Sequence, residues 1–188
     1  MIISISGPQS TGKTTLLNKL KEQFPTYKFI DEIFRKQFDG KQINLDHAET
    51  AFLLMYDFCN NNYIEPVNKN QICIMDRCGF DNIVYLTLHF MRLSDNLKKE
   101  YITKYAECVM YCKSLLNKVD HIFLTQSITK LIQDDNFRPK IYHQLFDQEI
   151  KLFNSLISLI DVPYTVLKSD VDTRIEQINH FIIKNESI

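Results

Sequence analysis

Apolar residues follow two different periods along the chain. Short apolar runs, the pattern of strands buried in a sheet, occur at residues 2–6, 27–30, 71–76, 121–125 and 163–168. In the longer segments between them, apolar residues recur every three or four positions, as they do on one face of a helix. We expect helices at residues 14–23, 46–63, 80–92, 97–119, 139–160 and 172–184. This alternation predicts an α/β fold, a three-layer sandwich around a five-stranded parallel sheet.

The size and composition of the chain favour one domain. Of the 188 residues, 45% are hydrophobic, which is enough for a sizeable core, and no repeat or linker divides them. There are 22 basic and 23 acidic residues, so the formal net charge is −1. A balanced charge gives no general attraction for polyanions, and nucleic acid would need a local basic patch. We expect a single domain over residues 1–188 and a small-molecule partner.

The cysteines and the absence of long apolar runs suggest a compartment. The five cysteines lack C-x-x-C spacing. Cys108 and Cys112 are one helical turn apart without a nearby His or second Cys pair, so we interpret the cysteines as buried or half-buried thiols in a reducing environment. No apolar run approaches the ~18 residues of a membrane span, and a strand expected at Ile2 leaves no place for a signal segment. We therefore expect a soluble, cytoplasmic protein.

The most specific motif follows the first expected strand. Residues 7–14 read GPQSTGKT and match G-x-x-x-x-G-K-[ST], the P-loop. Gly7 and Gly12 let the backbone N–H groups point at phosphate oxygens, and the following helix adds its positive end. Lys13 would reach the β and γ phosphates, and the Thr14 hydroxyl would bind Mg²⁺. The residues expected to bind ATP are Gly7, Pro8, Gln9, Ser10, Thr11, Gly12, Lys13, Thr14 and Thr15.

A carboxylate and a guanidinium follow the third expected strand. In the run ICIMDR, four apolar residues precede Asp76 and Arg77. At the end of a strand beside the first one, Asp76 can hold Mg²⁺ directly or through water, and Arg77 can turn toward the same cleft. The alternative for Asp76 is a capping role at the start of the next helix.

A second acidic and basic pair follows the second expected strand, in the run DEIFR. A kinase for a hydroxyl acceptor needs a carboxylate that orients the acceptor oxygen and takes its proton. Glu32 and Arg35 are three positions apart, so a helical turn would place them on one face. The alternative is a salt bridge or a cap without a catalytic role.

The irregular segment after the fourth expected strand carries a third group of charges. Asp134, Asp135 and Arg138 lie within residues 126–139, where small P-loop kinases have a lid. Arg138 could close over the phosphates and neutralise charge during transfer. The alternative is an ordinary loop before a helix that begins at Pro139.

Arginines and aromatic residues add weaker candidates. Arginine is scarce beside lysine, so each one is a candidate for a place that needs a planar guanidinium: Arg35, Arg77, Arg92, Arg138 and Arg174. The alternative is scattered surface arginine. Most aromatic residues at helical spacing belong to the core. The candidates for stacking on a nucleoside base are Tyr27, Phe52, Tyr56, Tyr63 and Tyr85.

Taken together, the segments resemble one family over residues 1–170. The runs GPQSTGKTTL, DEIFR, MDRCGFDNIVYL, DHIFLT and DDNFRP…LFDQEI…VPYTVL are similar in order and spacing to the P-loop kinase-like ATPases that include the nicotinamide riboside kinase domain. The resemblance implies a kinase-type P-loop fold, ATP with Mg²⁺ and often a nucleoside or nucleotide acceptor. Position by position, Glu32 and Arg35 match E-x-x-R, and Asp135 and Arg138 match the lid. Asp76, Arg77 and Asp81 match D-R-x-x-x-D.

We therefore expect an ATP-dependent phosphotransferase that acts on a small nucleoside or nucleotide. The expected catalytic residues are Lys13, Glu32, Asp76, Arg77 and Arg138. The expected acceptor-binding residues are Glu32, Arg35, Arg77 and Asp81, and the expected metal ligands are Thr14 and Asp76. One alternative is a 5′-polynucleotide kinase with a basic groove made by Lys98, Lys99, Lys104, Lys113 and Lys118. Another is a non-catalytic nucleotide-binding switch.

Overall fold

The centre of the protein is a parallel sheet with five strands. The computed structural model describes residues 1–32, 46–61, 71–126, 141–168 and 170–186. The strand order is β2-β3-β1-β4-β5, and every neighbouring pair is parallel. The strands are β1 (Ile2–Ser6), β2 (Lys28–Ile30), β3 (Cys73–Asp76), β4 (His121–Thr125) and β5 (Tyr164–Leu167). The predicted fold class is confirmed.

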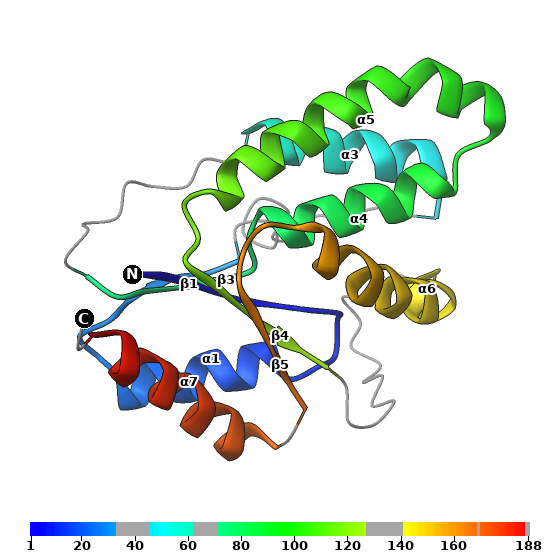
Figure 1. Ribbon diagram of the computed structural model, residues 1–188. Coiled ribbons are helices and arrows are strands. Elements are labelled where there is room, and N and C mark those ends of the chain that lie inside the picture. Colours follow the sequence, from blue (N-terminus) through cyan, green and yellow to red (C-terminus); the bar gives the residue numbers. More distant parts are fainter. Residues whose placement is uncertain (33–45, 62–70, 127–140, 169, 187–188) are drawn as a thin grey trace.

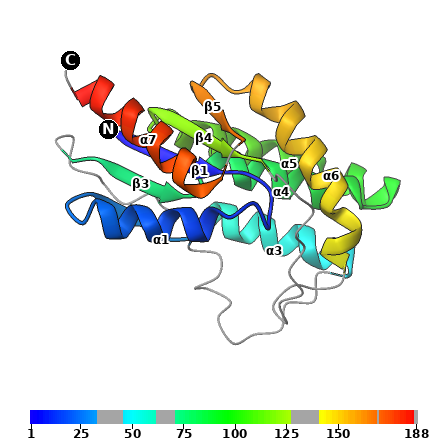
Figure 2. The same cartoon turned by 90° about the horizontal axis from the view of Figure 1, so that it is seen from below.

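Helices cover both faces of this sheet (Figure 1). On one face, α1 (Lys13–Gln23) and α7 (Val171–Glu186) pack against each other, as Figure 2 also shows. The other face carries α3 (Ala48–Asn61), α4 (Gly79–Met91), α5 (Asp95–Leu116) and α6 (Ile141–Leu156), which continues into a 3₁₀ turn at Ile157–Leu159. Within the described ranges, no helix combines the length and apolarity that a membrane span requires.

The two faces of the sheet belong to two hydrophobic cores, because successive side chains of a strand point to opposite faces. Ile3 and Ile5 of β1 and Phe123 of β4 are buried in the core that α1 and α7 cover. Ile122 and Leu124 of β4 lie in the larger core with residues of α3 to α6. The sheet is thus buried on both sides, and its carboxyl edge is where the connecting loops gather.

The strand register brings polar residues together at that edge. Ile5 of β1 is paired with Asp76 of β3, and the Arg77 N–H donates to the Ile5 carbonyl at 3.1 Å. On the other side of β1, Ser6 is paired with Leu124, so Thr125 lies next to the start of the P-loop. The P-loop, which follows β1, therefore begins between the ends of β3 and β4.

The expected elements match the observed ones, with ends that shift by a few residues. The largest differences are in the long helix expected at 97–119, which is observed at Asp95–Leu116, and in the helix expected to 160, which ends in the 3₁₀ turn. The expected lid at 126–139 lies outside the described residues except for Gln126, so the structure says nothing of a lid.

Candidate phosphate-binding and acceptor site

The P-loop requires glycine at two positions. Gly7 has φ 136° and Gly12 has φ 82°, both in the region that L side chains rarely adopt. A Cβ on Gly7 would also lie 2.5 Å from the carbonyl oxygen and from Oγ1 of Thr125. Ser10 takes a left-handed φ of 58° as well. The loop thus bends tightly between β1 and α1 and passes directly against the end of β4.

Side chains from distant elements hold the loop in this shape. Thr125 Oγ1 donates to the Ser6 carbonyl at 3.0 Å and lies 2.7 Å from Thr11 Oγ1, which in turn donates to the Pro8 carbonyl at 2.8 Å. Arg174 of α7 is only 3% exposed and donates through Nη1 to the Thr11 carbonyl at 2.6 Å. Its Nη2 donates to the Gln126 carbonyl at 2.7 Å. Thr125 of β4 and Arg174 of α7 thus hold the P-loop in this shape.

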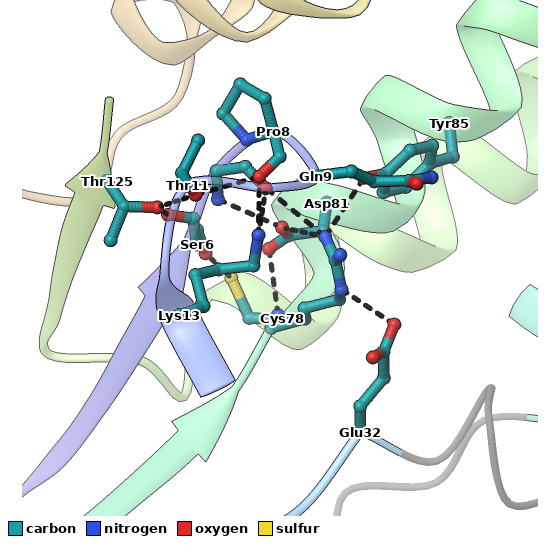
Figure 3. A network of polar contacts seen from close by, with 12 residues as sticks. Ser6, Pro8, Gln9, Thr11, Lys13, Glu32, Cys78, Asp81, Tyr85 and Thr125 are labelled. Carbon is teal, nitrogen blue, oxygen red and sulfur yellow. Dashed lines mark hydrogen bonds and ion pairs between the residues drawn. The ribbon is translucent and has the colours of Figure 1, made fainter. Parts of the chain in front are cut away.

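Lys13 lies inside the loop that precedes it (Figure 3). Its Nζ donates to the carbonyl oxygens of Gly7 at 2.8 Å and of Pro8 at 2.6 Å, and the residue is 6% exposed. Burial, and then the positive charge of Arg77, lowers the pKa of Lys13 from 10.5 to about 7. Negative charge that binds beside the loop would therefore favour the charged form of Lys13.

Arg77 connects the ends of β2 and β1 with the start of α4. Its Nε donates to Glu32 Oε1 at 2.8 Å, and its Nη1 donates to Asp81 Oδ1 and to the Tyr85 hydroxyl, both at 3.1 Å. Nη1 also lies 3.3 Å from the Gly7 carbonyl oxygen. The backbone of Arg77 has a left-handed φ of 72°, which a non-glycine residue adopts only when its surroundings hold it there. Glu32 and Arg77 are therefore brought together as a fixed pair.

Asp81 lies on the buried side of this network. It is fully buried, and its Oδ1 accepts from the Gly7 N–H at 3.2 Å as well as from Arg77. Its Oδ2 accepts from the Cys78 N–H at 3.1 Å, which caps the first turn of α4. Both oxygens are thus used within the protein. This placement fits a residue that positions the P-loop and Arg77 better than one that contacts an acceptor.

Asp76 has an oxygen that the described residues leave unsatisfied. Its Oδ1 is buried without a hydrogen-bond partner there, and burial raises the pKa of Asp76 above its usual 3.8, against the opposing effect of Arg77. A buried carboxylate oxygen needs a donor or a cation. Thr14 is exposed in the first turn of α1. One carboxylate and one hydroxyl, completed by phosphate oxygens and water, fit the oxygen ligands that Mg²⁺ takes.

Glu149 is a site residue that was not found from the sequence. It lies on α6, is 1% exposed, and its Oε1 accepts from the Gln9 N–H and from the Tyr85 hydroxyl, both at 2.7 Å. Its Oε2 is buried without a partner in the described chain. The signal was present, because Glu149 falls on the same helical face as Leu145, Phe146 and Phe153, which are buried. A carboxylate on an apolar stripe needs a polar partner.

Of the other expected residues, some lie in the described part of the chain and some do not. Thr15 is exposed next to Thr14, whereas Phe52 is fully buried and Tyr27 stacks on Phe24 in the α1 and α7 core. Tyr85 is used by the network, with the Arg77 guanidinium 5.1 Å from its ring centre. The remaining expectations, on Arg35, Tyr63, Asp134, Asp135 and Arg138, lie outside the described residues.

Comparison with solved structures gives the same fold. Deoxyadenosine kinase from M. mycoides with bound dCTP has a TM-score of 0.72 and 18% identity, with 100% of each chain covered. The structure of that enzyme with the products dCMP and a flexible dCDP gives 0.70 and 18%, covering 98% of this chain and 99% of the other. YorR from Bacillus subtilis in complex with phosphorylated GDP gives 0.56 and 14%, covering 100% and 99%.

The comparisons at the level of sequence give a family. No curated protein matches the chain significantly. A family model described as an AAA domain matches residues 2–174, which is most of the chain. Together with the shared fold, this match confirms the resemblance to P-loop kinase-like ATPases. The chain belongs to the AAA domain family of P-loop proteins.

Proposed function

We propose that the protein is an ATP-dependent kinase that transfers the γ-phosphoryl group to a small nucleoside or nucleotide. The observation that carries the proposal is the Glu32–Arg77 pair. It joins the end of β2 to the end of β3 and lies against the P-loop, because Arg77 Nη1 also reaches the Gly7 carbonyl. An acidic and a basic group beside a phosphate loop are what the transfer of a phosphoryl group to a hydroxyl requires.

The donor end of the site is made by the P-loop. Its backbone N–H groups and Lys13 bind the β and γ phosphates, and the α1 N-terminus adds a favourable dipole. Thr14 and Asp76 would hold Mg²⁺, which neutralises phosphate charge when it is bound. Lys13 exchanges its two carbonyl acceptors for phosphate oxygens, which favours its charged form.

The acceptor end is made by Glu32 and Arg77. Glu32 is partly buried, with 15% of its side chain exposed, and in the proposed reaction it meets the hydroxyl of the acceptor. It orients that hydroxyl and accepts its proton as the bond to phosphorus forms. Arg77 donates a hydrogen bond to Glu32 and offers its positive charge to the acceptor. Arg35 and Arg138 complete the proposed acceptor and phosphate contacts.

The structural relatives support a nucleotide-sized acceptor. The M. mycoides enzyme is a deoxyadenosine kinase whose structures hold dCTP or the products dCMP and dCDP. YorR holds phosphorylated GDP. The alignments span essentially the whole of each chain, so the same layers surround the corresponding edge of the sheet.

The decisive experiment is an acceptor panel with purified protein and ATP. Nucleosides, deoxynucleosides, nucleoside monophosphates, nicotinamide riboside and 5′-hydroxyl oligonucleotides are compared by ADP formation and by mass spectrometry of the phosphorylated product. We expect a nucleoside or nucleotide to be phosphorylated, and Lys13→Ala to abolish the transfer. Phosphorylation of the oligonucleotide alone, or of no acceptor, would contradict the proposal.

A pair of variants tests the role of Glu32. Glu32→Gln keeps the size of the side chain but removes the base, and we expect kcat to fall by roughly 10²-fold or more. Asp31→Asn is the matched control, because Asp31 is the adjacent carboxylate and forms an exposed ion pair with Lys21. We expect this control to keep kcat. Equal effects of the two substitutions would remove Glu32 from the catalytic step.

A further inference from the structure

Three cysteines meet in the helical layer, where the backbone of Cys112 packs against Gly79 at the start of α4. Cys59 comes from α3, and Cys108 and Cys112 come from successive turns of α5. All three are fully buried free thiols, and their Sγ atoms lie within 4.8 Å of one another. The proposed kinase mechanism uses none of them. We call these three residues the thiol cluster.

The spacing of the sulfurs fits an ion better than a disulfide. Three sulfurs bound to one ion at about 2.3 Å each lie at most about 4 Å apart, and roughly 3.5 Å apart around a pyramidal ion such as arsenic(III). From the observed limit of 4.8 Å, the sulfurs would close by at most roughly 1–1.5 Å. A disulfide would instead require two sulfurs to approach to about 2.05 Å. Small rotations about χ1 therefore suffice for an ion.

The described residues around the thiol cluster are apolar. Its members belong to the larger hydrophobic core, with Phe52, Val84 and Leu116. The largest influences on their pKa values are hydrogen bonds among the three thiols and burial, and no Lys or Arg side chain is among the influences found in the described chain. A complex that kept a net negative charge here would bear a large desolvation cost.

We propose that the thiol cluster is a binding site for a trivalent thiophilic ion, with arsenic(III) as its probe. Arsenous acid reacts with three thiols to form three As–S bonds, and each thiol proton leaves with one hydroxyl group as water. Arsenic stays in the trivalent state, so no oxidant or reductant takes part. Three thiolates around a trivalent centre give a neutral complex, which an apolar core accommodates at the lowest electrostatic cost.

Charge and ligand number disfavour the commoner soft metals. A structural zinc takes four ligands, whereas the cluster in the described residues has three. Three thiolates would leave Zn²⁺ with one net negative charge and Cu⁺ with two, inside an apolar core. Copper(I) is a soft ion that prefers thiolate ligands. Comparing the binding of Cu⁺ with that of arsenic(III) therefore distinguishes selection by net charge from selection by softness.

The test is native mass spectrometry of the reduced full-length protein with arsenite. We expect one arsenic per chain at the cost of three hydrogens, which identifies a complex with three As–S bonds. Cys59→Ala and Cys108→Ala should each lose this species and bind arsenite on the order of tenfold more weakly or worse, because one tethered ligand is gone. Cys73→Ala is the matched control, since Cys73 is a buried thiol outside the cluster.

Thermal unfolding provides a second measurement that does not depend on kinase activity. Arsenite should raise the Tm of the wild type and of Cys73→Ala, because it binds the folded state. Near-ultraviolet circular dichroism checks that the cluster variants remain folded, and Cys112→Ala replaces any variant that does not. Arsenite bound equally by all variants, or Zn²⁺ or Cu⁺ bound more tightly than arsenic by the wild type, would overturn the proposal.

Discussion

The protonation of one side chain, Lys13, depends on the charge around the phosphate loop. Its ammonium is buried on two carbonyl oxygens, and its pKa is lowered from 10.5 to about 7 by burial and by Arg77. Between pH 7 and 10.5 the folded protein therefore holds this lysine largely neutral, whereas the unfolded chain keeps it charged. By linkage, its burial costs most stability below pH 7, and this cost disappears as the pH rises toward 10.5.

This shift predicts that ATP binding takes up a proton. Phosphate beside Nζ favours the charged amine, so the pKa of Lys13 rises in the complex and affinity falls above pH 7 by at most about tenfold per pH unit. Calorimetric titration at pH 8 in buffers of different ionisation enthalpy measures the uptake. Lys13→Arg stays charged at this pH and should bind without it. Equal proton uptake by wild type and Lys13→Arg would exclude Lys13 as the proton acceptor.

Asp76 makes a second prediction at the same scale. If its unsatisfied Oδ1 holds Mg²⁺, Asp76→Asn should raise the Mg²⁺ concentration that gives half-maximal rate. A capping role is not observed, because Cys78 and Asp81 form the cap of α4. A Mg²⁺ titration of both proteins measures the role of Asp76 in metal binding. A normal Mg²⁺ dependence in Asp76→Asn would exclude Asp76 as a metal ligand.

At the scale of elements, α6 supports the P-loop from the side. Glu149 accepts from the Gln9 N–H and the Tyr85 hydroxyl, and Tyr85 accepts from Arg77. One carboxylate on α6 thus connects the phosphate loop with the residues proposed to bind the acceptor. Its role is to position these groups, since the contacts it makes in the structure are with the protein itself.

Removing this carboxylate should therefore affect both ends of the site. Glu149→Ala leaves two buried donors without their acceptor, and we expect a loss of about 2–3 kcal/mol in the free energy of unfolding together with a higher Kd for ATP. Glu149→Gln keeps an acceptor oxygen and should recover most of the ATP affinity. Gln148→Ala, an exposed neighbour on α6, should change neither quantity. Loss of stability with an unchanged Kd would reduce Glu149 to a structural residue.

The sequence predicts where several candidate site residues lie, for a physical reason. Gly7, Asp76 and Glu32 stand at or just after the ends of β1, β3 and β2, and the carboxyl ends of parallel strands meet at one edge of the sheet. The pattern of strands and helices was therefore enough to bring these residues together. The ends of the predicted strands and helices differ from the observed ends by a few residues, because local capping, as at Cys78, decides where a helix begins.

The supporting contacts could not be predicted in the same way. Thr125, Glu149 and Arg174 reach the P-loop across 114 to 163 positions of sequence, through side-chain rotamers that no local pattern specifies. Asp81 was recognised through a motif, but its burial against the Gly7 N–H depends on how α4 packs under the loop. Such tertiary contacts follow from packing and not from periodicity.

At the scale of the whole molecule, the balanced charge favours a small acceptor over a polynucleotide. The net charge is −1, and Lys98 of the basic set on α5 pairs with Asp95 while Lys104 lies over the rings of Tyr56 and Tyr101. The balanced charge and these contacts support the proposed small acceptor over a polynucleotide.

We therefore expect the KM for the acceptor to change little as salt rises to ~0.15 M, apart from screening of its own charge. Contacts with a strand would instead weaken binding steeply, in proportion to the number of phosphates touched. The measurement is KM against ionic strength, with electrophoretic mobility of a 5′-hydroxyl oligonucleotide as the parallel assay. A steep salt slope together with a shifted oligonucleotide band would favour a polynucleotide kinase.

The contact between Arg174 and the P-loop has a consequence for how the protein is made. Thr11 leaves the ribosome early, but the guanidinium that binds its carbonyl is synthesised 163 residues later. Because domains fold as cooperative units, the nascent chain carries a complete phosphate-loop sequence long before it has the means to hold that loop in shape. We therefore expect the nascent chain to bind nucleotide only after α7 has emerged and docked.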